Sequence, residues 1–302
     1  MSEQQRPAGW GDEARVRQWI AGAEQREAQM VPVNEELFAA AALQPGETVL
    51  DIGCGTGPTT RQAAALVGPA GRTVGTDLSP AMIEAAARLA AELAEAAPAS
   101  SQPTSSQPTS SQPGWLAADA ETYDFGTGQY DVVISRFGVM FFPDPCAAFA
   151  NLLRATRPGG RLVAAIWRTR EHVPLFAIPY DTATEVLDEL GVSYEPVPID
   201  DNQCSLGTHE SVTAVLAPAG WCDIETRPSD GYLYIGGELT PAQAAESALD
   251  IGPIRGVLDG RSEQIRQAVR VRLQTTFERW YDGTGILVPA GFMILTARRS
   301  AD

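Results

Sequence analysis

The sequence predicts an α/β fold in which helices cover both faces of a parallel sheet. Between residues 47 and 167, short apolar runs alternate with segments of helical periodicity, and this alternation is typical of repeated βαβ units. The first of these runs leads into the glycine-rich stretch Gly53 to Gly57. Closely spaced glycines between a strand and a helix allow a ligand to approach the backbone.

The predicted elements alternate in a regular order up to Trp167. The first five predicted strands are residues 47–55, 71–79, 115–120, 130–137 and 161–167. The predicted helices around them are residues 12–44, with an interruption near Pro32, and residues 59–68, 80–97 and 147–160. Gly68 near the end of one helix and Pro80 at the start of another fit the usual preferences at helix ends.

After Trp167 the regular alternation is lost. Helical periodicity recurs in several separate segments, at residues 174–191, after His209, and at 240–252 and 262–280. Two further apolar segments, near residues 222–228 and 288–299, are predicted to be the last two strands.

Residues 98–114 are predicted to form a flexible, partly extended loop. They contain an almost perfect repeat of the five-residue unit Ser-Ser-Gln-Pro-Thr, whose composition provides no apolar side chains for a core. Two interpretations are open, a modification or docking tract and an expanded repeat in a tolerant surface loop; the second is favoured.

Composition and charge narrow the class of protein. The chain has 302 residues, 22 Lys and Arg against 38 Asp and Glu, and a net charge of −16, which disfavours a nucleic-acid partner. Its four cysteines lack CxxC spacing, which argues against structural zinc, an iron–sulfur cluster and a disulfide scaffold. No signal peptide or membrane-length apolar run is evident, so we expect a cytoplasmic protein without a membrane partner.

The glycine-rich stretch differs from a dinucleotide-binding loop. Pro58 occupies the place of the third glycine in G-x-G-x-x-G, and Asp51 lies two residues before Gly53. A carboxylate 4 Å from a pyrophosphate would be unfavourable by roughly 1–4 kcal/mol. S-adenosylmethionine carries a sulfonium and an ammonium and no phosphate, so the loop favours this ligand over NAD(P).

Carboxylates follow three of the predicted strands. Asp51, Asp77 and Asp119 are placed so that the carboxyl edge of one parallel sheet would carry all three, and this edge is where such folds bind ligands. Asp77 could accept hydrogen bonds from two ribose hydroxyls, and Asp119 could accept one from an adenine amino group.

Five stretches, VLDIGCGTG, GTDLSPAMI, ADAE, YDVVISRFGVMFF and LLRATRPGGRLV, resemble the class I S-adenosylmethionine-dependent methyltransferases. Within that family the chain is similar to the ubiquinone/menaquinone-biosynthesis type of small-molecule enzyme. The resemblance implies a Rossmann-like, doubly wound sheet of seven mostly parallel strands, the last one antiparallel, with helical lid insertions. It also implies a single methyltransferase domain over residues 1–302. Its expected parts are an N-terminal helical lid segment (1–34), a cofactor-binding core (35–168) and substrate-lid insertions at 169–210 and 240–280.

The resemblance also implies roles at the cofactor site. The backbone of Gly53 and Gly55 would contact the methionine portion, while Asp77 would hold the ribose. Asp119 and the Ala120 amide would hold the adenine. Ser135 would bind the amino end of the cofactor, and Asp51 would act on it through water or directly. The remaining residues expected at this site are Thr56 and Leu78.

The methyl acceptor is predicted to be a small, apolar or oxygen-rich metabolite. Methyl transfer from a sulfonium is an in-line displacement, which depends mainly on positioning and needs a base only if the acceptor must lose a proton. His172, after the fifth predicted strand, is the candidate base. Arg136 could bind an acidic acceptor or form an ordinary salt bridge. Aromatic and Met side chains near the strand ends favour an apolar acceptor pocket, and no metal is expected.

Other functions are less consistent with the sequence. Ser135 to Gly138 replaces the Asn/Asp-Pro-Pro-aromatic stretch of enzymes that methylate nucleic-acid amino groups, and Arg136 replaces the carboxylates of a metal-dependent catechol-type enzyme. An NAD(P)-dependent oxidoreductase is disfavoured by Pro58 and Asp51. A non-catalytic cofactor-binding regulatory module remains open, as does the oligomeric state.

Overall fold

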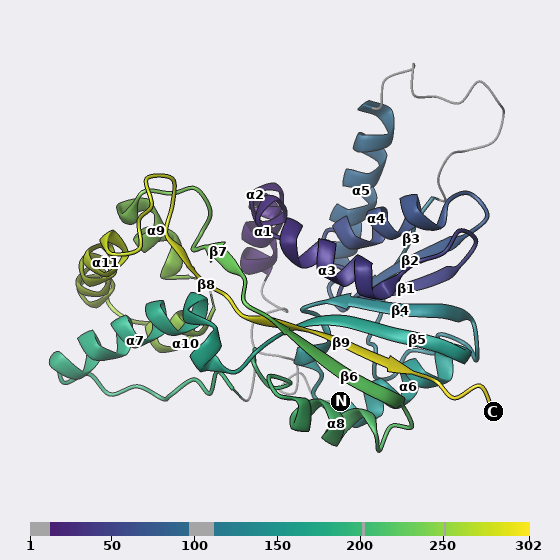
Figure 1. The fold of residues 1–302 in the computed structure, drawn as a ribbon. Helices are drawn as coiled ribbons and strands as arrows, with labels where there is room; N and C mark the ends of the chain where they lie inside the picture. Colours follow the sequence, from purple (N-terminus) through teal and green to yellow (C-terminus); the bar gives the residue numbers. More distant parts are fainter. Residues whose placement is uncertain (1–12, 97–111, 201–202, 251) are drawn as a thin grey trace.

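Seven strands form one mixed sheet in the computed structural model, which describes residues 13–96, 112–200, 203–250 and 252–302. The strand order is β3-β2-β1-β4-β5-β9-β6 (Figure 1). Strands β1 to β5 pair in parallel, whereas β9 is antiparallel to both β5 and β6. The bounds are β1 Thr48–Ile52, β2 Arg72–Asp77, β3 Gly114–Ala117, β4 Tyr130–Arg136, β5 Thr156–Trp167, β6 Cys222–Ser229 and β9 Phe292–Arg298. The predicted fold class, including the antiparallel last strand, is confirmed.

Helices cover both faces of this sheet. Figure 1 shows α3 (Val31–Ala41) and α4 (Pro58–Val67) on one face, and α6 (Pro145–Ala155) and α8 (His209–Leu216) on the other. Burial of six consecutive residues of β5, Leu162 to Trp167, agrees with coverage of both faces. Proline begins α4, α5 (Pro80–Ala96) and α6, where its missing N–H costs no intrahelical hydrogen bond.

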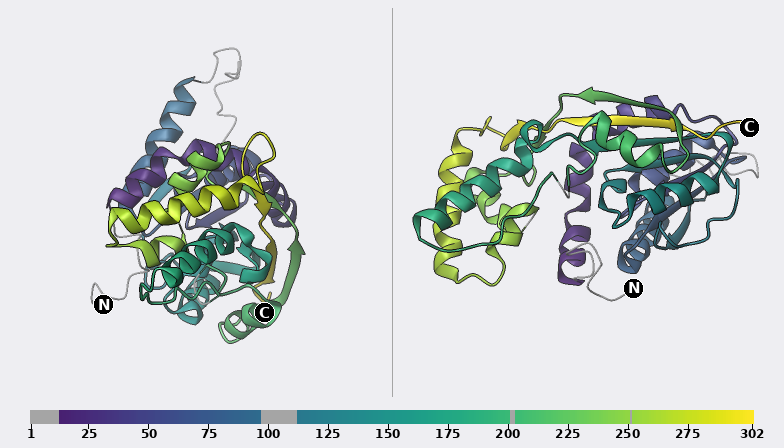
Figure 2. Two further views of the ribbon diagram at one scale, coloured as in Figure 1. Left: turned by 90° about the vertical axis from the view of Figure 1, so that its left-hand side faces the viewer. Right: turned by 90° about the horizontal axis from the view of Figure 1, so that it is seen from below.

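Four further helices form a group beside the sheet. They are α7 (Pro174–Glu189), α9 (Pro241–Ala248), α10 (Pro253–Leu258) and α11 (Glu263–Glu278). Figures 1 and 2 show this helical group at one end of the molecule, with α1 (Glu13–Ala21) and α2 (Ala23–Gln29) between it and the helices on the sheet. The short antiparallel pair of β7 (Tyr232–Tyr234) and β8 (Leu287–Pro289) connects the group to the sheet. Residues 169–210 and 240–280 contribute to this group; their role as lids stays a prediction.

Some element boundaries differ from the prediction. The helix expected at 147–160 ends at Ala155, because Pro158 and two glycines cannot continue it, and β5 begins at Thr156. The helix expected at 12–44 is three helices that break at Gly22 and Met30, while Pro32 lies in the first turn of α3. Most of the predicted repeat loop at 98–114 lies outside the described residues. Within the described part of the chain, no helix combines the length and apolarity that a membrane span requires.

Candidate functional site

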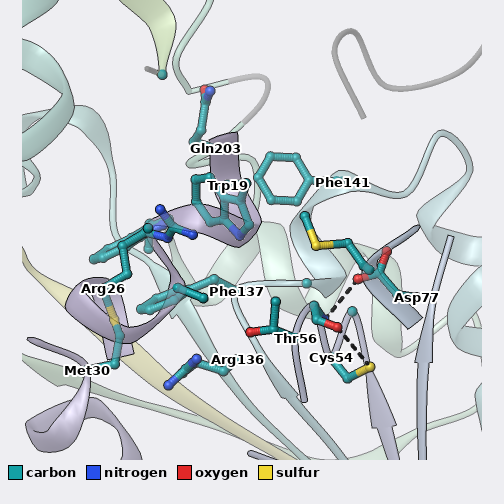
Figure 3. Close-up of a pocket in the computed structure, with 18 of the residues that line it drawn as sticks. Trp19, Arg26, Met30, Cys54, Thr56, Asp77, Arg136, Phe137, Phe141 and Gln203 are labelled. Carbon is teal, nitrogen blue, oxygen red and sulfur yellow. Dashed lines mark hydrogen bonds between the residues drawn. The ribbon is translucent and has the colours of Figure 1, made fainter. Parts of the chain in front are cut away.

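The carboxyl ends of the parallel strands border a cavity of about 1020 Å³ (Figure 3). Residues at or just after the ends of β1 to β5 form one side of its lining, and α2, α7, β7 and α10 provide the other. The strand order reverses between β1 and β4, and open α/β sheets bind ligands in the crevice at such a reversal. The cavity is as large as a site for a cofactor together with a small second molecule.

Most of the predicted site residues line this cavity. Those in the lining are Gly53, Gly55, Thr56, Asp77, Leu78, Asp119, Ala120 and Arg136. Three predicted residues, Asp51, Ser135 and His172, are described by the structure but are absent from the lining. The predicted residues in the lining lie along one edge of the sheet, and the contacts that each would make with a ligand stay predictions.

Asp77 lies at the end of β2 and is fixed by two backbone amides. Its Oδ2 accepts from the Gly55 N–H at 3.0 Å, and its Oδ1 accepts from the Ser79 N–H at 2.9 Å. Burial raises the pKa of Asp77, although both hydrogen bonds oppose this shift. Each oxygen keeps a further lone pair that a pair of hydroxyl donors in the cavity could use.

The adenine side of the predicted site is a turn after β3. The Asp119 Oδ1 accepts from the Glu121 N–H at 2.9 Å, and the Asn151 side chain donates to the Ala120 carbonyl at 2.8 Å. These bonds hold the turn from both sides. Within the described chain, the Ala120 N–H and the Asp119 Oδ2 have no partner, so one donor and one acceptor are free at the cavity wall.

Asp51 lies beneath the glycine loop. Its side chain is 1 % exposed, and its Oδ2 accepts from the hydroxyls of Thr59 and Thr60 at 2.6 and 2.7 Å. These two residues, in the first turn of α4, turn one oxygen of the carboxylate toward the helix. The expected contact of Asp51 with the amino end of a cofactor, directly or through water, stays a prediction. Its Oδ1 is buried without a partner among the described residues.

We expect Asp51 to make stability depend on pH. Burial raises its pKa from 3.8 to about 6, against the hydrogen bonds of Thr59 and Thr60. The folded chain therefore binds more protons than the unfolded chain between about pH 4 and pH 6, so the free energy of unfolding falls as pH rises through this window. Between about pH 4 and pH 6, the free energy of unfolding of the wild type should fall by on the order of 2–3 kcal/mol relative to that of Asp51→Asn. Urea unfolding of both proteins at several pH values measures it, and parallel pH profiles would contradict it.

Ser135 is a structural residue at the end of β4. It is fully buried, its Oγ donates to the Ile52 carbonyl at 2.8 Å and it accepts from the Gly138 N–H at 3.2 Å. Ser135 is absent from the cavity lining, and the expected contact of its side chain with a cofactor amino group stays a prediction. The hydroxyl joins the loops that follow β1 and β4.

His172 lies outside the cavity. It ends a one-turn helix, Arg170–His172, and its Nδ1 is 2.9 Å from the Thr169 hydroxyl. Its backbone carbonyl accepts from the Gly291 N–H at 2.8 Å. The strand end was predicted correctly, but the chain turns away from the cavity before the imidazole, so the geometry does not support a role as base.

Arg136 lines the cavity, but its guanidinium is already paired. It donates to both Glu27 carboxylate oxygens at 2.8 and 2.6 Å and to the Asn34 Oδ1 at 2.8 Å. Asn34 in turn donates to Glu27 at 2.8 Å. This three-residue network ties α2 and α3 to the end of β4. Its members Glu27 and Arg136 are 109 residues apart in sequence. Of the two roles considered for Arg136, the salt bridge is the one observed.

Aromatic rings form a second part of the cavity lining, here called the aromatic wall, which consists of Trp19, Phe137, Phe141, Trp167 and Phe176. Phe137 and Trp167 stack with centroids 3.8 Å apart, and Phe176 meets Trp167 edge-on at 5.3 Å. The predicted aromatic clustering at the strand ends is confirmed for these rings. Arg26, Glu27 and Gln203 also line the cavity and were missed. For Arg26 and Glu27, the polar periodicity of α2 does not distinguish a cavity face from a solvent face.

Comparison with known proteins supports the same class of site. Residues 50–164 match the family model described as a methyltransferase domain. The chain is 34% identical over 152 residues to an uncharacterised protein of Mycobacterium tuberculosis, covering 49% of this chain and 48% of that protein. It is 32% identical over 140 residues to the ubiquinone/menaquinone biosynthesis C-methyltransferase UbiE of Ectopseudomonas mendocina, covering 46% and 49%. It is also 32% identical over 131 residues to the aklanonic acid methyltransferase DauC of Streptomyces sp. strain C5, covering 43% and 53%.

Solved structures share the fold at low identity. The cyclase SpnF gives a TM-score of 0.51 at 18% identity, with 90% of this chain and 82% of that chain covered. The YcgJ protein of Bacillus subtilis gives a TM-score of 0.52 at 14% identity, with 88% and 97% covered. These two likenesses concern the fold alone, and the sequence matches span about half the length of each curated relative.

Fold and site define an α/β protein with a cavity at the carboxyl edge of its sheet. The family match covers residues 50–164, the part of the core whose motifs resemble the class I S-adenosylmethionine-dependent methyltransferases. The cofactor that this match implies is S-adenosylmethionine. The residues fit it, because the hydroxyl-accepting Asp77 and the open turn at Asp119 and Ala120 border one cavity.

Proposed function

We propose that this chain transfers the methyl group of S-adenosylmethionine to a small, largely apolar acceptor. The observation that carries this proposal is that one cavity runs from the carboxylates Asp77 and Asp119 to the aromatic wall. The first part has the donors and acceptors that an adenosyl group requires. The second part has the apolar surface that binds small organic molecules.

In this proposal the polar residues of the sheet edge hold the cofactor. Asp77 accepts from the ribose hydroxyls, Asp119 and the Ala120 N–H bind the adenine, and the backbone of Gly53 and Gly55 contacts the methionine portion. Thr56 and Leu78 complete the lining there. Bound S-adenosylmethionine supplies an electrophilic methyl group on its sulfonium.

The aromatic wall and the helical group would act on the acceptor by positioning it. In-line displacement is accelerated when the acceptor atom is held in line with the breaking bond. Side chains from α2, α7, β7 and α10 face the strand ends across the cavity. An acceptor between them would be oriented and separated from water.

Calorimetric titration with S-adenosylhomocysteine, run beside NADH, tests the cofactor assignment. We expect micromolar affinity for the former and none for NADH. Binding of NADH alone would indicate that the site belongs to an oxidoreductase instead. Binding of S-adenosylhomocysteine without turnover of any compound in an acceptor screen would favour the non-catalytic regulatory module.

Asp77→Ala should weaken binding of S-adenosylhomocysteine by about 1–3 kcal/mol, because charge-assisted hydrogen bonds to the ribose are lost. The matched control is Asp124→Ala, which changes an exposed carboxylate outside the cavity lining. Calorimetry on both variants, with folding checked by circular dichroism, gives the result. Unchanged affinity in a folded Asp77→Ala protein would remove Asp77 from the site.

A further inference from the structure

Arg26 of α2 is a cation on the acceptor side of the cavity. Figure 3 shows it beside Trp19, across the cavity from Asp77. Its guanidinium carbon lies 4.0 Å from the centroid of the Trp19 ring, which is within the range of a cation–π contact. The ring thus covers one face of the planar guanidinium.

No carboxylate neutralises Arg26 among the described residues. Its Nη2 is buried and has no hydrogen-bond partner in the described chain. The adjacent Glu27 uses both carboxylate oxygens to bind Arg136 and Asn34. Burial alone lowers the pKa of Arg26 to about 10, so the group stays charged at neutral pH. A buried, charged donor without a partner is costly, and a bound anion would compensate for it.

The backbone around Arg26 makes room for this arrangement. A Cβ at Gly22 would lie 2.5 Å from the Arg26 Nη1, so a larger residue there would displace the guanidinium. Gly22 is also the break between α1 and α2, and it places Trp19 at the end of one helix against Arg26 in the next. The position of the cation is thus set before any ligand binds.

The described cavity lining offers neither a histidine nor an unpaired carboxylate on the acceptor side to deprotonate a neutral acceptor. Within the described chain the lining contains no histidine, and its carboxylates are Glu27, Asp77 and Asp119. Glu27 is paired, and the two aspartates lie on the cofactor side. A carboxylic acid is already ionised at neutral pH and has no proton to lose.

We propose that the methyl acceptor is an organic acid whose carboxylate binds Arg26 while its apolar body packs on the aromatic wall. This inference rests on the proposed function and specifies its substrate class. The fork of a guanidinium matches a carboxylate in two parallel hydrogen bonds. A neutral acceptor of the same shape would leave the buried guanidinium uncompensated.

The test uses pairs of acids and their primary amides, which share shape and differ in charge. The pairs are benzoate and benzamide, 2-naphthoate and 2-naphthamide, and octanoate and octanamide. Each is titrated into protein saturated with S-adenosylhomocysteine. In at least one pair the acid should bind at least about tenfold more tightly than the amide, and Arg26→Met should reduce this preference to about twofold or less.

Two further variants separate charge from folding. Arg26→Lys should retain part of the preference, because the charge remains and the planar fork is lost. Arg88→Met, an exposed arginine of α5 outside the lining, should leave the preference unchanged. Since no described carboxylate pairs with Arg26, we expect Arg26→Met to fold. Should it fail to fold, Arg26→Gln provides the neutral comparison.

The outcomes distinguish this inference from the proposed function. Failure of the wild type to bind S-adenosylhomocysteine would refute the proposed function itself. Binding of S-adenosylhomocysteine, with no pair favouring the acid, would overturn only the assignment of an acidic acceptor. A preference for the acid that persists in Arg26→Met would also overturn it, because the anion would then bind elsewhere.

Discussion

Glu27→Ala is expected to lower the free energy of unfolding by about 3–4 kcal/mol. The substitution removes a carboxylate that accepts two hydrogen bonds from Arg136 and one from Asn34. Arg136 is only 15% exposed, so its charge would remain largely buried with a single amide oxygen as partner. Removing one member of such a pair costs more than the pair contributes, because the other charge is left without compensation.

Denaturant unfolding of four variants tests this account. Glu27→Ala/Arg136→Met removes both charges, so it should recover part of the loss. Together with Arg136→Met alone, it completes a double-mutant cycle that gives the coupling energy. Glu189→Ala breaks an exposed ion pair with Arg272 and should lower the free energy of unfolding much less than Glu27→Ala does. If Glu27→Ala and Glu189→Ala cost the same, the buried network does not stabilise the chain.

The same network predicts the direction of a pH effect. Burial by itself would raise the pKa of Glu27, but hydrogen bonding and the charge of Arg136 outweigh it, and the pKa is lowered from 4.5. A lowered pKa in the folded state means that the stabilisation is present above about pH 4.5 and is lost as pH falls. Asp51 changes stability in the opposite direction over an adjacent pH range. The difference in free energy of unfolding between wild type and variant should therefore rise with pH for Glu27→Ala and fall with pH for Asp51→Asn.

The fold was predictable where local sequence alone determines it. Strand β5 contains a continuous apolar run, Leu162 to Trp167, as expected for a sheet buried on both faces, and prolines mark the starts of α4, α5 and α6. The pairing of β7 with β8 was not predictable, because two three-residue strands, more than 50 residues apart in the printed sequence, leave no periodic signal. The end of α6 was missed because helical spacing continues past Ala155, although Pro158 excludes a helix there.

The site was predictable as an edge of the sheet and less so as a set of contacts. Asp77 ends β2 and Asp119 follows β3, and both line the cavity, whereas Asp51 lies within β1 and does not. The difference comes from Thr59 and Thr60, whose hydroxyls bind Asp51 from the next helix. Arg26 had no signal at all, because its contact with Trp19 and the lack of a carboxylate partner among the described residues are properties of the folded chain.

Gly53→Ala should lower the free energy of unfolding by about 3–5 kcal/mol, which is a large fraction of the stability of a typical domain. Gly53 has φ +67°, a left-handed conformation that costs a residue with a Cβ about 1–2 kcal/mol. A Cβ there would also lie 2.7 Å from the Gly138 Cα. Gly138 cannot withdraw easily, because its N–H binds the Ser135 hydroxyl, which in turn binds the Ile52 carbonyl.

Gly55→Ala is the matched control, because it has the left-handed backbone without the collision. Gly55 has φ +54°, and a Cβ there meets no protein atom within 4 Å. It should therefore cost only the conformational part, about 1–2 kcal/mol. Unfolding without ligand compares the two variants directly. Equal losses would show that the contact between Gly53 and Gly138 contributes nothing. A much larger loss in Gly53→Ala would show that the loop carrying the cofactor site is held by two glycines packed backbone to backbone, at the point where β1 and β4 end side by side.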